Sequence, residues 1–450
     1  MRKEERVRNR LTSWPVKKPG LSALAIAALL AACGSPATSP ASELPETTAA
    51  ESRAGQPVEV PELNLTVGGI VPITGPQAPF GVWEGAAIEL GGTAVNEAAE
   101  AAGIPLNVTV KIEDEGAGPD VATQAATKLV TGEGATCLVG PNNSADGVAI
   151  ATNVAVPRTT PIIGVLTTSP ALTTLEDDGF YFRTTASDAK QAIVLANFAA
   201  EELGGADGRT LNIGARNDNF GSPLADGVAA QWESLGGTVG EMVKWDPNAT
   251  TYDADAQQLV SGDPAGWVII DFVTTFQKVA PAIVRTGEWD PARTFVSALQ
   301  VPNLPELVGE ETTEGMRGLA PGAIGDSPLD EQFKEYWNEH VGEDVTLGAG
   351  AISAFDGVVL CALAALAAQS TDGQAIRDQL TAVSGPGGDK FDYTQLVDAL
   401  TALASGEDID YEGMYGPIDF DENGDVAAGE YGTIEFIDGV LTITGFVPAP

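Results

Sequence analysis

Short apolar runs and longer amphipathic stretches alternate along the chain from residue 63 onward. The runs are rich in Val and Ile with little polar alternation, which is typical of strands buried on both faces of a parallel sheet. Eight such runs alternate with stretches of helical periodicity, at residues 63–73, 106–114, 135–141, 160–166, 210–218, 238–245, 266–273 and 293–299. They form two successive series, which predicts an α/β fold with two Rossmann-like lobes and parallel sheets. Because ligands of open α/β sheets bind beyond the carboxyl ends of the strands, we expect a cleft between the lobes.

The carboxyl-terminal part has a different pattern. Residues 350–404 have helical periodicity, and residues 351–367 are their most apolar stretch. This stretch is shorter than the roughly 20 residues of a membrane-spanning helix, so we predict that it is a core helix. Residues 416–446 return to strands, with turns expected at Asn423-Gly424 and Asp438-Gly439.

The first 61 residues read as an export signal and a tether. Seven basic residues precede an apolar run at residues 21–32, which ends in "LAAC" at Cys33. That motif resembles the bacterial lipobox, in which the cysteine becomes the lipidated amino terminus after cleavage. We therefore predict a lipoprotein signal peptide at residues 1–32. We predict a lipidated Cys33 with a flexible linker at residues 33–61, since that segment is rich in Pro, Ser and Thr. The alternative is an ordinary cleaved signal peptide. In the first case the protein is extracytoplasmic and anchored to the cell membrane by the lipid.

The acidic composition narrows the range of partners. Residues 1–32 hold 7 of the 23 basic and 2 of the 63 acidic residues, so the chain after them carries 16 basic and 61 acidic side chains, a formal charge of about −45. Such a surface repels nucleic acid and anionic lipid, which excludes a nucleic-acid partner. The acidic residues are spread along the chain, as expected of the surface of a folded body.

Few residues are candidates for catalysis or metal binding. His340 is the single histidine, in a polar stretch that suits an exposed helix, which excludes a multi-histidine metal site. Cys137 and Cys361 both lie in apolar surroundings; they could pair, but the pattern favours two unpaired buried thiols. Asp419, Asp421, Asn423, Gly424 and Glu430 match the spacing of an EF-hand loop, although strand-like flanks favour a charged hairpin tip. We expect no cofactor, no metal and no enzymatic activity.

Several motifs, in their order and spacing, carry a family resemblance over residues 63–446. They are "GGIVPITGPQAPFG", "IEDEGAGPDVATQAATKLV", "LVGPNNSADGVAIA", "TPIIGVLTTSPALT", "FYFRTTASD", "DNFGSPLADG", "AFDGVVLCALAAL" and "YEGMYGPIDFDENGDVAAGEY". With them the chain resembles the type I periplasmic solute-binding proteins, specifically the branched-chain amino acid (Leu/Ile/Val) binding family of ABC transporters. The resemblance implies two lobes joined by a multi-strand hinge, with residues 62–185 and 320–430 in lobe 1 and residues 186–319 and 431–450 in lobe 2.

The resemblance also implies a ligand site. In this family, hydroxyl groups and backbone N–H groups at helix amino termini hold the ligand carboxylate, and aromatic side chains pack on its body. The positions that match these roles are Asn143, Ser144, Leu166, Thr167 and Thr168 for the polar groups, and Phe80, Phe220, Phe272 and Phe355 for the aromatic ones. Where amino-acid binders carry an acidic residue for the ligand ammonium, this sequence has Leu299 and Gln300, and Asp271 is the candidate substitute.

The function implied is that of a lipid-anchored substrate-binding subunit of an ABC importer. It binds a branched-chain amino acid or a similar small apolar acid or amide and docks, as a monomer, on a membrane permease. Two alternatives remain at this stage. The first is a ligand-sensing subunit for a membrane receptor, which would use the same cleft. The second is an extracytoplasmic hydrolase, against which the sequence offers neither a Walker-type loop nor a serine elbow with a usable base.

Overall fold

The computed structural model describes residues 60–75, 77–321, 327–342, 345, 347, 348, 350–426 and 430–448. All of these lie in one compact unit of the chain, residues 55–450. The predicted signal peptide, the predicted lipidation site Cys33 and nearly all of the predicted linker lie outside the described residues.

The amino-terminal half of the described chain builds a parallel sheet, which we call the first sheet. Its strand order is β2-β1-β3-β4-β5, and every neighbouring pair is parallel. The strands are β1 (Leu63–Val71), β2 (Leu106–Asp114), β3 (Cys137–Val139), β4 (Ile162–Gly164) and β5 (Tyr181–Arg183). Helical segments between and after them are α2 (Ala78–Ala102), α3 (Pro119–Thr131), α4 (Ser144–Ile150), the π-helical turn η1 (Ala151–Ala155), α5 (Val156–Arg158) and α6 (Pro170–Thr173).

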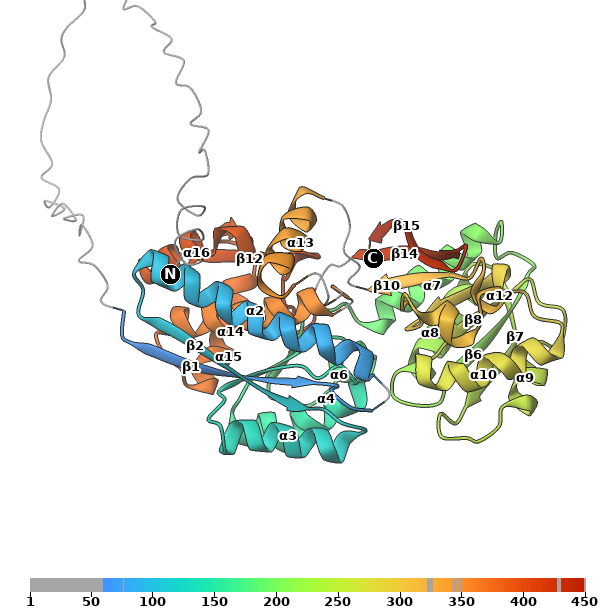
Figure 1. Cartoon of the computed structure of the whole chain (residues 1–450), viewed down its shortest axis with the longest axis horizontal. Helices are drawn as coiled ribbons and strands as arrows, with labels where there is room; N and C mark the ends of the chain where they lie inside the picture. The colour runs from blue at the N-terminus through green and yellow to red at the C-terminus, as the bar shows by residue number, and fades with distance from the viewer. Residues whose placement is uncertain are drawn as a thin grey trace, which may run out of the picture. The chain divides into compact units, whose positions relative to one another are not determined.

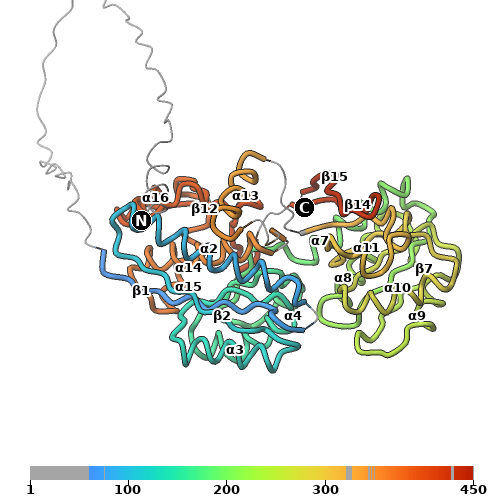
Figure 2. Tube along the Cα trace, in the orientation of Figure 1, coloured from blue at the N-terminus to red at the C-terminus, as the bar shows by residue number. Residues whose placement is uncertain are grey.

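Both faces of the inner strand β1 are buried along most of its length, as the continuous apolar runs predict, whereas the edge strand β2 alternates between buried and more exposed side chains. Leu65 and Val67 of β1 belong to the core cluster that α2 shares with α14 (Ala351–Ala368), whereas Ile70 belongs to the cluster under α3 and α4. Figure 1 accordingly shows α2 and α14 on one face of β1 and β2, and α3 on the other. Figure 2 shows the returning chain of α14 beside β1, with which it is in contact.

Helix α14 is a core helix, for a reason that the sequence argument did not give. With 18 residues and a mean hydropathy of 2.1 it is, by length and composition, able to cross a membrane, so the prediction that it is too short was wrong. However, 89% of this apolar stretch is buried inside the protein. Burial against α2, α15 (Gly373–Ser384) and β1, not insufficient length, makes it part of the protein core.

A disulfide joins β3 to α14. Cys137 and Cys361 are fully buried and form a disulfide bond across a sequence separation of 224 residues. The interpretation as two unpaired thiols was therefore wrong. Their apolar surroundings are compatible with either state, and only the packing of α14 on the first sheet brings the two side chains together.

A second sheet, larger and mixed, follows in the sequence. Its order is β15-β14-β10-β9-β8-β6-β7, with parallel pairs from β10 to β7 and antiparallel pairs at β10-β14 and β14-β15. The strands are β6 (Thr210–Arg216), β7 (Thr238–Trp245), β8 (Gly266–Ile270), β9 (Thr294–Ser297), β10 (Arg317–Pro321), β14 (Glu430–Ile437) and β15 (Val440–Pro448). Helices α7 (Asp188–Glu202) and α8 (Gly221–Ser234) share one core cluster with it; α9 (Asp253–Leu259) and α10 (Val273–Thr286) share another. Short turns η2 (Pro291–Arg293), α11 (Leu304–Val308) and α12 (Glu310–Thr313) complete this part.

The carboxyl-terminal strands extend the second sheet and form a third, small sheet. Strands β14 and β15 form a hairpin in which Ile437 pairs with Val440, so the loop is the predicted Asp438-Gly439, both with positive φ (51° and 72°). Before it, the chain adds α13 (Pro328–His340), the 3-10 turn η3 (Tyr393–Gln395), α16 (Leu396–Ala404) and the small sheet of β11 (Asp389–Phe391), β12 (Ile409–Gly413) and β13 (Gly416–Pro417). The predicted fold class, an α/β fold with parallel sheets, is confirmed. The predicted lobe boundaries stay a prediction.

Candidate functional site

A pocket lies where the parallel strands of both sheets end. Its lining consists of Gln77, Phe80, Asn142, Ser144, Leu166, Thr168, Gln191, Phe220, Phe272, Ser297, Ala298 and Gln300. Most of these follow directly after β1, β3, β4, β6, β8 or β9, and Gln191 comes from the first turn of α7. The empty space between these side chains, including the part open to solvent at its mouth, is about 510 Å³.

Buried amides form the wall beside β1 and β3. Gln77 Nε2 donates to Asn142 Oδ1 and Asn142 Nδ2 donates to Glu84 Oε1, each at 2.6 Å. Glu84 lies behind this wall and is 1% exposed. Burial raises the pKa of its carboxyl to about 8, although the hydrogen bond from Asn142 acts in the opposite direction. Asn142 is thus held in one orientation by groups on both sides.

A second buried carboxyl, that of Glu115, accepts hydrogen bonds from backbone N–H groups at the start of α4. Its two oxygens accept the N–H groups of Asn142 and Asn143 at 2.9 and 2.7 Å. The Asn143 side chain caps α4 by accepting from the backbone of Ala145 and does not line the pocket. The backbone N–H group of Asn143, at a position that the family resemblance assigns to a ligand carboxylate, is therefore bonded to a carboxyl of the protein itself.

The loop after β4 places two predicted site residues in the pocket and turns a third away. Leu166 and Thr168 line the cavity, whereas Thr167 is fully buried and its hydroxyl accepts the hydrogen bond of Tyr181. Gly164 makes this bond sterically possible, because a Cβ there would lie 2.0 Å from the Thr167 hydroxyl oxygen. Thr167 therefore supports the loop from behind.

Thr168 is tied to the start of α7. Its hydroxyl donates to Asp188 Oδ2 at 2.9 Å, and the Asp188 backbone N–H donates to the Thr168 carbonyl at 2.7 Å. Asp188 is fully buried, and burial raises the pKa of its carboxyl to about 7 despite the hydrogen bond from Thr168. The hydroxyl hydrogen of Thr168 thus points at Asp188, which leaves its lone pairs for the cavity.

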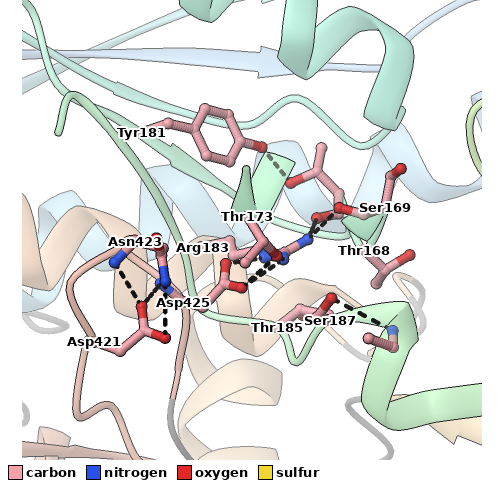
Figure 3. Close-up of polar contacts among 12 residues, drawn as sticks. Thr168, Ser169, Thr173, Tyr181, Arg183, Thr185, Ser187, Asp421, Asn423 and Asp425 are labelled. Atoms are coloured by element: carbon pink, nitrogen blue, oxygen red, sulfur yellow. Dashed lines mark hydrogen bonds and ion pairs between the residues drawn. The ribbon is translucent and has the colours of Figure 1, made fainter. Parts of the chain in front are cut away.

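Arg183, at the end of β5, fixes the backbone of this loop (Figure 3). It is fully buried, and its guanidinium donates to the carbonyls of Thr167 and Ser169, both at 2.9 Å. Its remaining donors reach the Thr173 hydroxyl and both carboxylate oxygens of Asp425, the latter at 2.5 and 2.8 Å. A bidentate pair between residues 242 apart in the sequence therefore connects the pocket loop to the segment before β14.

Asp425 belongs to the loop whose spacing matches a calcium site. Phe420 and Val426 form an antiparallel bridge, and Asp421 Oδ1 accepts the backbone N–H groups of Asn423 and Asp425 (Figure 3). These two carboxylates thus bond to the backbone and to Arg183. Within the described chain, no group of three or more His, Cys, Asp or Glu residues could hold a metal ion. Residues 427–429 of the loop lie outside the described residues.

Two stacked phenylalanines form the wall on the side of the second sheet. The rings of Phe220 and Phe272 lie 5.1 Å apart with an interplanar angle of 12°, and the Arg216 guanidinium covers the Phe272 ring at 3.8 Å. Phe80 contributes a ring on the opposite side and packs edge-on against Trp83. These three aromatic residues, predicted from the sequence, line one cavity.

Two other predicted site residues do not line the pocket. Phe355 is fully buried in the middle of α14, where it packs against Phe333 and Tyr393. Asp271 is fully buried behind Phe272; its oxygens accept from the Phe272 backbone and the Trp245 ring nitrogen, and Arg216 lies 3.6 Å away. The protein's own donors therefore occupy the carboxyl that was the candidate partner for a ligand ammonium.

Six lining residues were not predicted, namely Gln77, Asn142, Gln191, Ser297, Ala298 and Gln300. A sequence signal existed for two of them. Asn142 precedes the predicted Asn143, and Gln300 is one of the two residues at the position of the missing acid. The other residue there, Leu299, is fully buried in the core. Gln191 had no signal, since only the packing of α7 brings it to the cavity.

The buried carboxyls make stability depend on pH. Burial raises the pKa of Glu84 and Asp271 to about 8 and of Asp188 and Asp356 to about 7. In the unfolded chain such groups ionise near pH 4, so between pH 4 and 8 the native state binds more protons. The free energy of unfolding is therefore expected to fall as pH rises from 5 to 8. Over the pH range in which a carboxyl is protonated in the native state and ionised in the unfolded chain, it lowers the free energy of unfolding by about 1.4 kcal/mol for each pH unit of increase.

Urea unfolding at pH 5 and pH 8 measures this dependence. Asp356→Asn, which can still accept the hydrogen bond of Tyr411, is expected to flatten it. Glu233→Gln removes one exposed negative charge from α8 and serves as the control for general charge repulsion. Equal slopes for the two variants would contradict the assignment of the effect to buried carboxyls.

Comparison with known proteins places the chain in a family. A family model described as periplasmic binding protein matches residues 64–432. No curated protein sequence matches the chain. Its fold is similar to leucine binding protein LivK from Thermotoga maritima (TM-score 0.65, 20% identity, covering 85% of this chain and 98% of that one). It is also similar to the branched-chain amino acid transporter substrate binding protein LivJ from Streptococcus pneumoniae, solved with isoleucine (TM-score 0.68, 18% identity, covering 86% of this chain and 99% of that one). A third similar structure is a solute binding protein of an ABC transporter from R. palustris, solved with 4-hydroxybenzoate (TM-score 0.66, 15% identity, covering 86% of this chain and 98% of that one). Since the family model spans most of the sequence, the chain belongs to the periplasmic binding protein family.

Proposed function

We propose that the protein is the substrate-binding subunit of an ABC importer, held at the extracytoplasmic face of the cell membrane by a lipid on Cys33. It binds a branched-chain amino acid or a similar small apolar acid or amide, and performs no chemistry on it. The observation that carries the proposal is a single cavity lined from the carboxyl ends of strands in both sheets, by three aromatic rings and by hydroxyl and amide groups. Solved proteins with this fold whose names include a leucine, isoleucine or aromatic-acid ligand support it.

In this proposal the two sheets, with their helices, form the two lobes that the sequence predicts. A ligand that touches residues of both lobes stabilises their closed arrangement, which is a shift of a pre-existing equilibrium. The closed form docks on a membrane permease, and one protein molecule carries one ligand. The acidic surface keeps the protein soluble at the end of its linker and excludes nucleic acid as a partner.

The proposal is tested on the full chain expressed in a bacterial host. We expect the wild-type protein in the membrane fraction and Cys33→Ser in the soluble fraction. In a thermal-shift screen of amino acids, amides and small carboxylates, a ligand at 100 times its dissociation constant adds about 2.7 kcal/mol of stability. Phe220→Ala should abolish most of that shift, whereas Phe446→Ala, at an exposed site in β15, should keep it. If no compound raises the unfolding midpoint, the proposed function is wrong.

A further inference from the structure

The cavity contains no ionisable side chain. None of its twelve lining residues is Asp, Glu, Lys, Arg or His. The Arg216 guanidinium does not line the cavity: it lies over the ring of the lining residue Phe272 and is paired with Asp218 at 2.5 Å. A ligand ammonium or carboxylate would therefore enter this cavity without a side chain of opposite charge on its wall, which is unfavourable for a desolvated ion.

Several of the neutral donors that could serve a carboxylate are also engaged. Glu115 accepts the backbone N–H groups of Asn142 and Asn143, and the Thr168 hydroxyl donates to Asp188. These donors are therefore directed at carboxyl groups of the protein and not at a ligand. The Ser144 hydroxyl, which lines the cavity and accepts from the Ser169 N–H group, keeps its hydrogen for a ligand acceptor. The wall beside the first sheet thus offers an acceptor a neutral donor and no positive charge, which suits a carbonyl oxygen better than a carboxylate.

Two amide atoms on the opposite wall have no hydrogen-bond partner within the described part of the protein. Gln191 is 2% exposed; its Oε1 accepts from the Ser297 hydroxyl at 3.3 Å, and its Nε2 is an unpaired buried donor. Gln300 Oε1 is an unpaired buried acceptor. Since unpaired buried polar atoms are costly, these two mark the place of a ligand group that both accepts and donates hydrogen bonds.

We infer that the pocket selects an uncharged ligand, an apolar body that packs on Phe220 and Phe272 and ends in a primary carboxamide. Its carbonyl oxygen accepts from Gln191 and its N–H group donates to Gln300. A simple ammonium has donors only and a simple carboxylate has acceptors only, so neither satisfies both glutamines. An α-amino acid supplies both kinds of group, but each of its charged ends would enter the cavity without a side chain of opposite charge. This inference rests on the proposed function and narrows its ligand class from acids and amides to amides.

Isosteric probes test the charge preference on the full chain. Isothermal titration at pH 7.5 compares benzamide with benzoate, and 3-methylbutanamide with 3-methylbutanoate and L-leucine. At least one amide is expected to bind at least tenfold more tightly than its matched acid, and 3-methylbutanamide more tightly than L-leucine. Equal or tighter binding of the acids or of L-leucine would overturn the inference and leave the proposed function standing. If none of the five probes binds, the inference fails. The proposed function fails as well only if the wider thermal-shift screen also finds no ligand.

Variants assign the preference to the two glutamines. Gln300→Glu replaces the neutral acceptor by a carboxylate, and we expect it to weaken amide binding at least tenfold and to improve the relative affinity for L-leucine. Gln191→Leu removes the donor and is expected to weaken amide binding to a similar extent. Gln257→Glu, exposed on α9, adds the same charge outside the pocket and should bind as the wild type does. Unchanged amide affinity in both pocket variants, with unfolding midpoints near that of the wild type, would refute the proposed contacts.

Discussion

Replacing Asp425 by alanine is expected to lower the free energy of unfolding by about 3–5 kcal/mol, because it leaves the buried guanidinium of Arg183 without a counter-charge. Arg183 is fully buried, and Asp425 is its only ionic partner among the described residues. Chemical denaturation of the full chain measures the loss. Ligand affinity is expected to fall as well, since the same guanidinium holds the carbonyls of Thr167 and Ser169 beside the cavity.

Two further variants separate the charge effect from the loss of the loop. Asp421→Ala removes an exposed carboxylate whose hydrogen bonds to described residues all lie within the same turn, and it should cost only about 1 kcal/mol. Arg183→Met combined with Asp425→Leu removes both charges and is expected to be more stable than Asp425→Ala alone. Equal costs for Asp421→Ala and Asp425→Ala would show that the pair contributes no more than any other turn contact.

Removing the disulfide has the second large expected effect. In a Cys33→Ser background, Cys137→Ala with Cys361→Ala is expected to lower the free energy of unfolding by about 2–5 kcal/mol. The bond connects residues 224 positions apart, about half the length of the chain, so it restricts the conformations of that segment in the unfolded state. It also holds α14 on the first sheet. Denaturant titration of the oxidised protein and of the double variant gives the difference.

Reduction provides the control for this substitution. Dithiothreitol should bring the Cys33→Ser protein to about the stability of the double variant and leave the double variant unchanged. If oxidised and reduced protein unfold at the same denaturant concentration, the bond does not stabilise the native state. An oxidising compartment outside the cytoplasm is required for the bond to form, in agreement with the proposed location.

The protein carries a large negative net charge, but the side chains that line its cavity are neutral. Carboxyl groups surround it, but Glu84, Glu115 and Asp188 are buried, and burial raises the pKa of each. Their hydrogen bonds hold Asn142 and Thr168, which line the cavity, in fixed orientations. The buried carboxyls thus act as acceptors that orient the wall, while the amides and hydroxyls meet the ligand.

The residue pattern alone determined the local structure and the fold class. Continuous Val- and Ile-rich runs predict strands buried on both faces, and the inner strands of the two sheets confirm this. The edge strands β2 and β7 keep partly exposed side chains. Asp438-Gly439 favours positive φ at both positions and forms the predicted two-residue hairpin loop. These features depend on neighbours within a few residues or on the period of the pattern, which a sequence displays directly.

Only the tertiary structure decided which side chains meet. Phe355 and Phe272 are alike in sequence terms, yet the first lies in the middle of a buried helix and the second at the end of a strand beside the cavity. The pairing of Cys137 with Cys361 and of Arg183 with Asp425 joins residues more than 200 positions apart. Gln191 lies in α7 and Gln300 in the loop after β9, and no periodic pattern in the sequence relates these two positions that both line the cavity. Such contacts depend on how helices and strands pack in space, and the spacing of residues along one chain does not encode that directly.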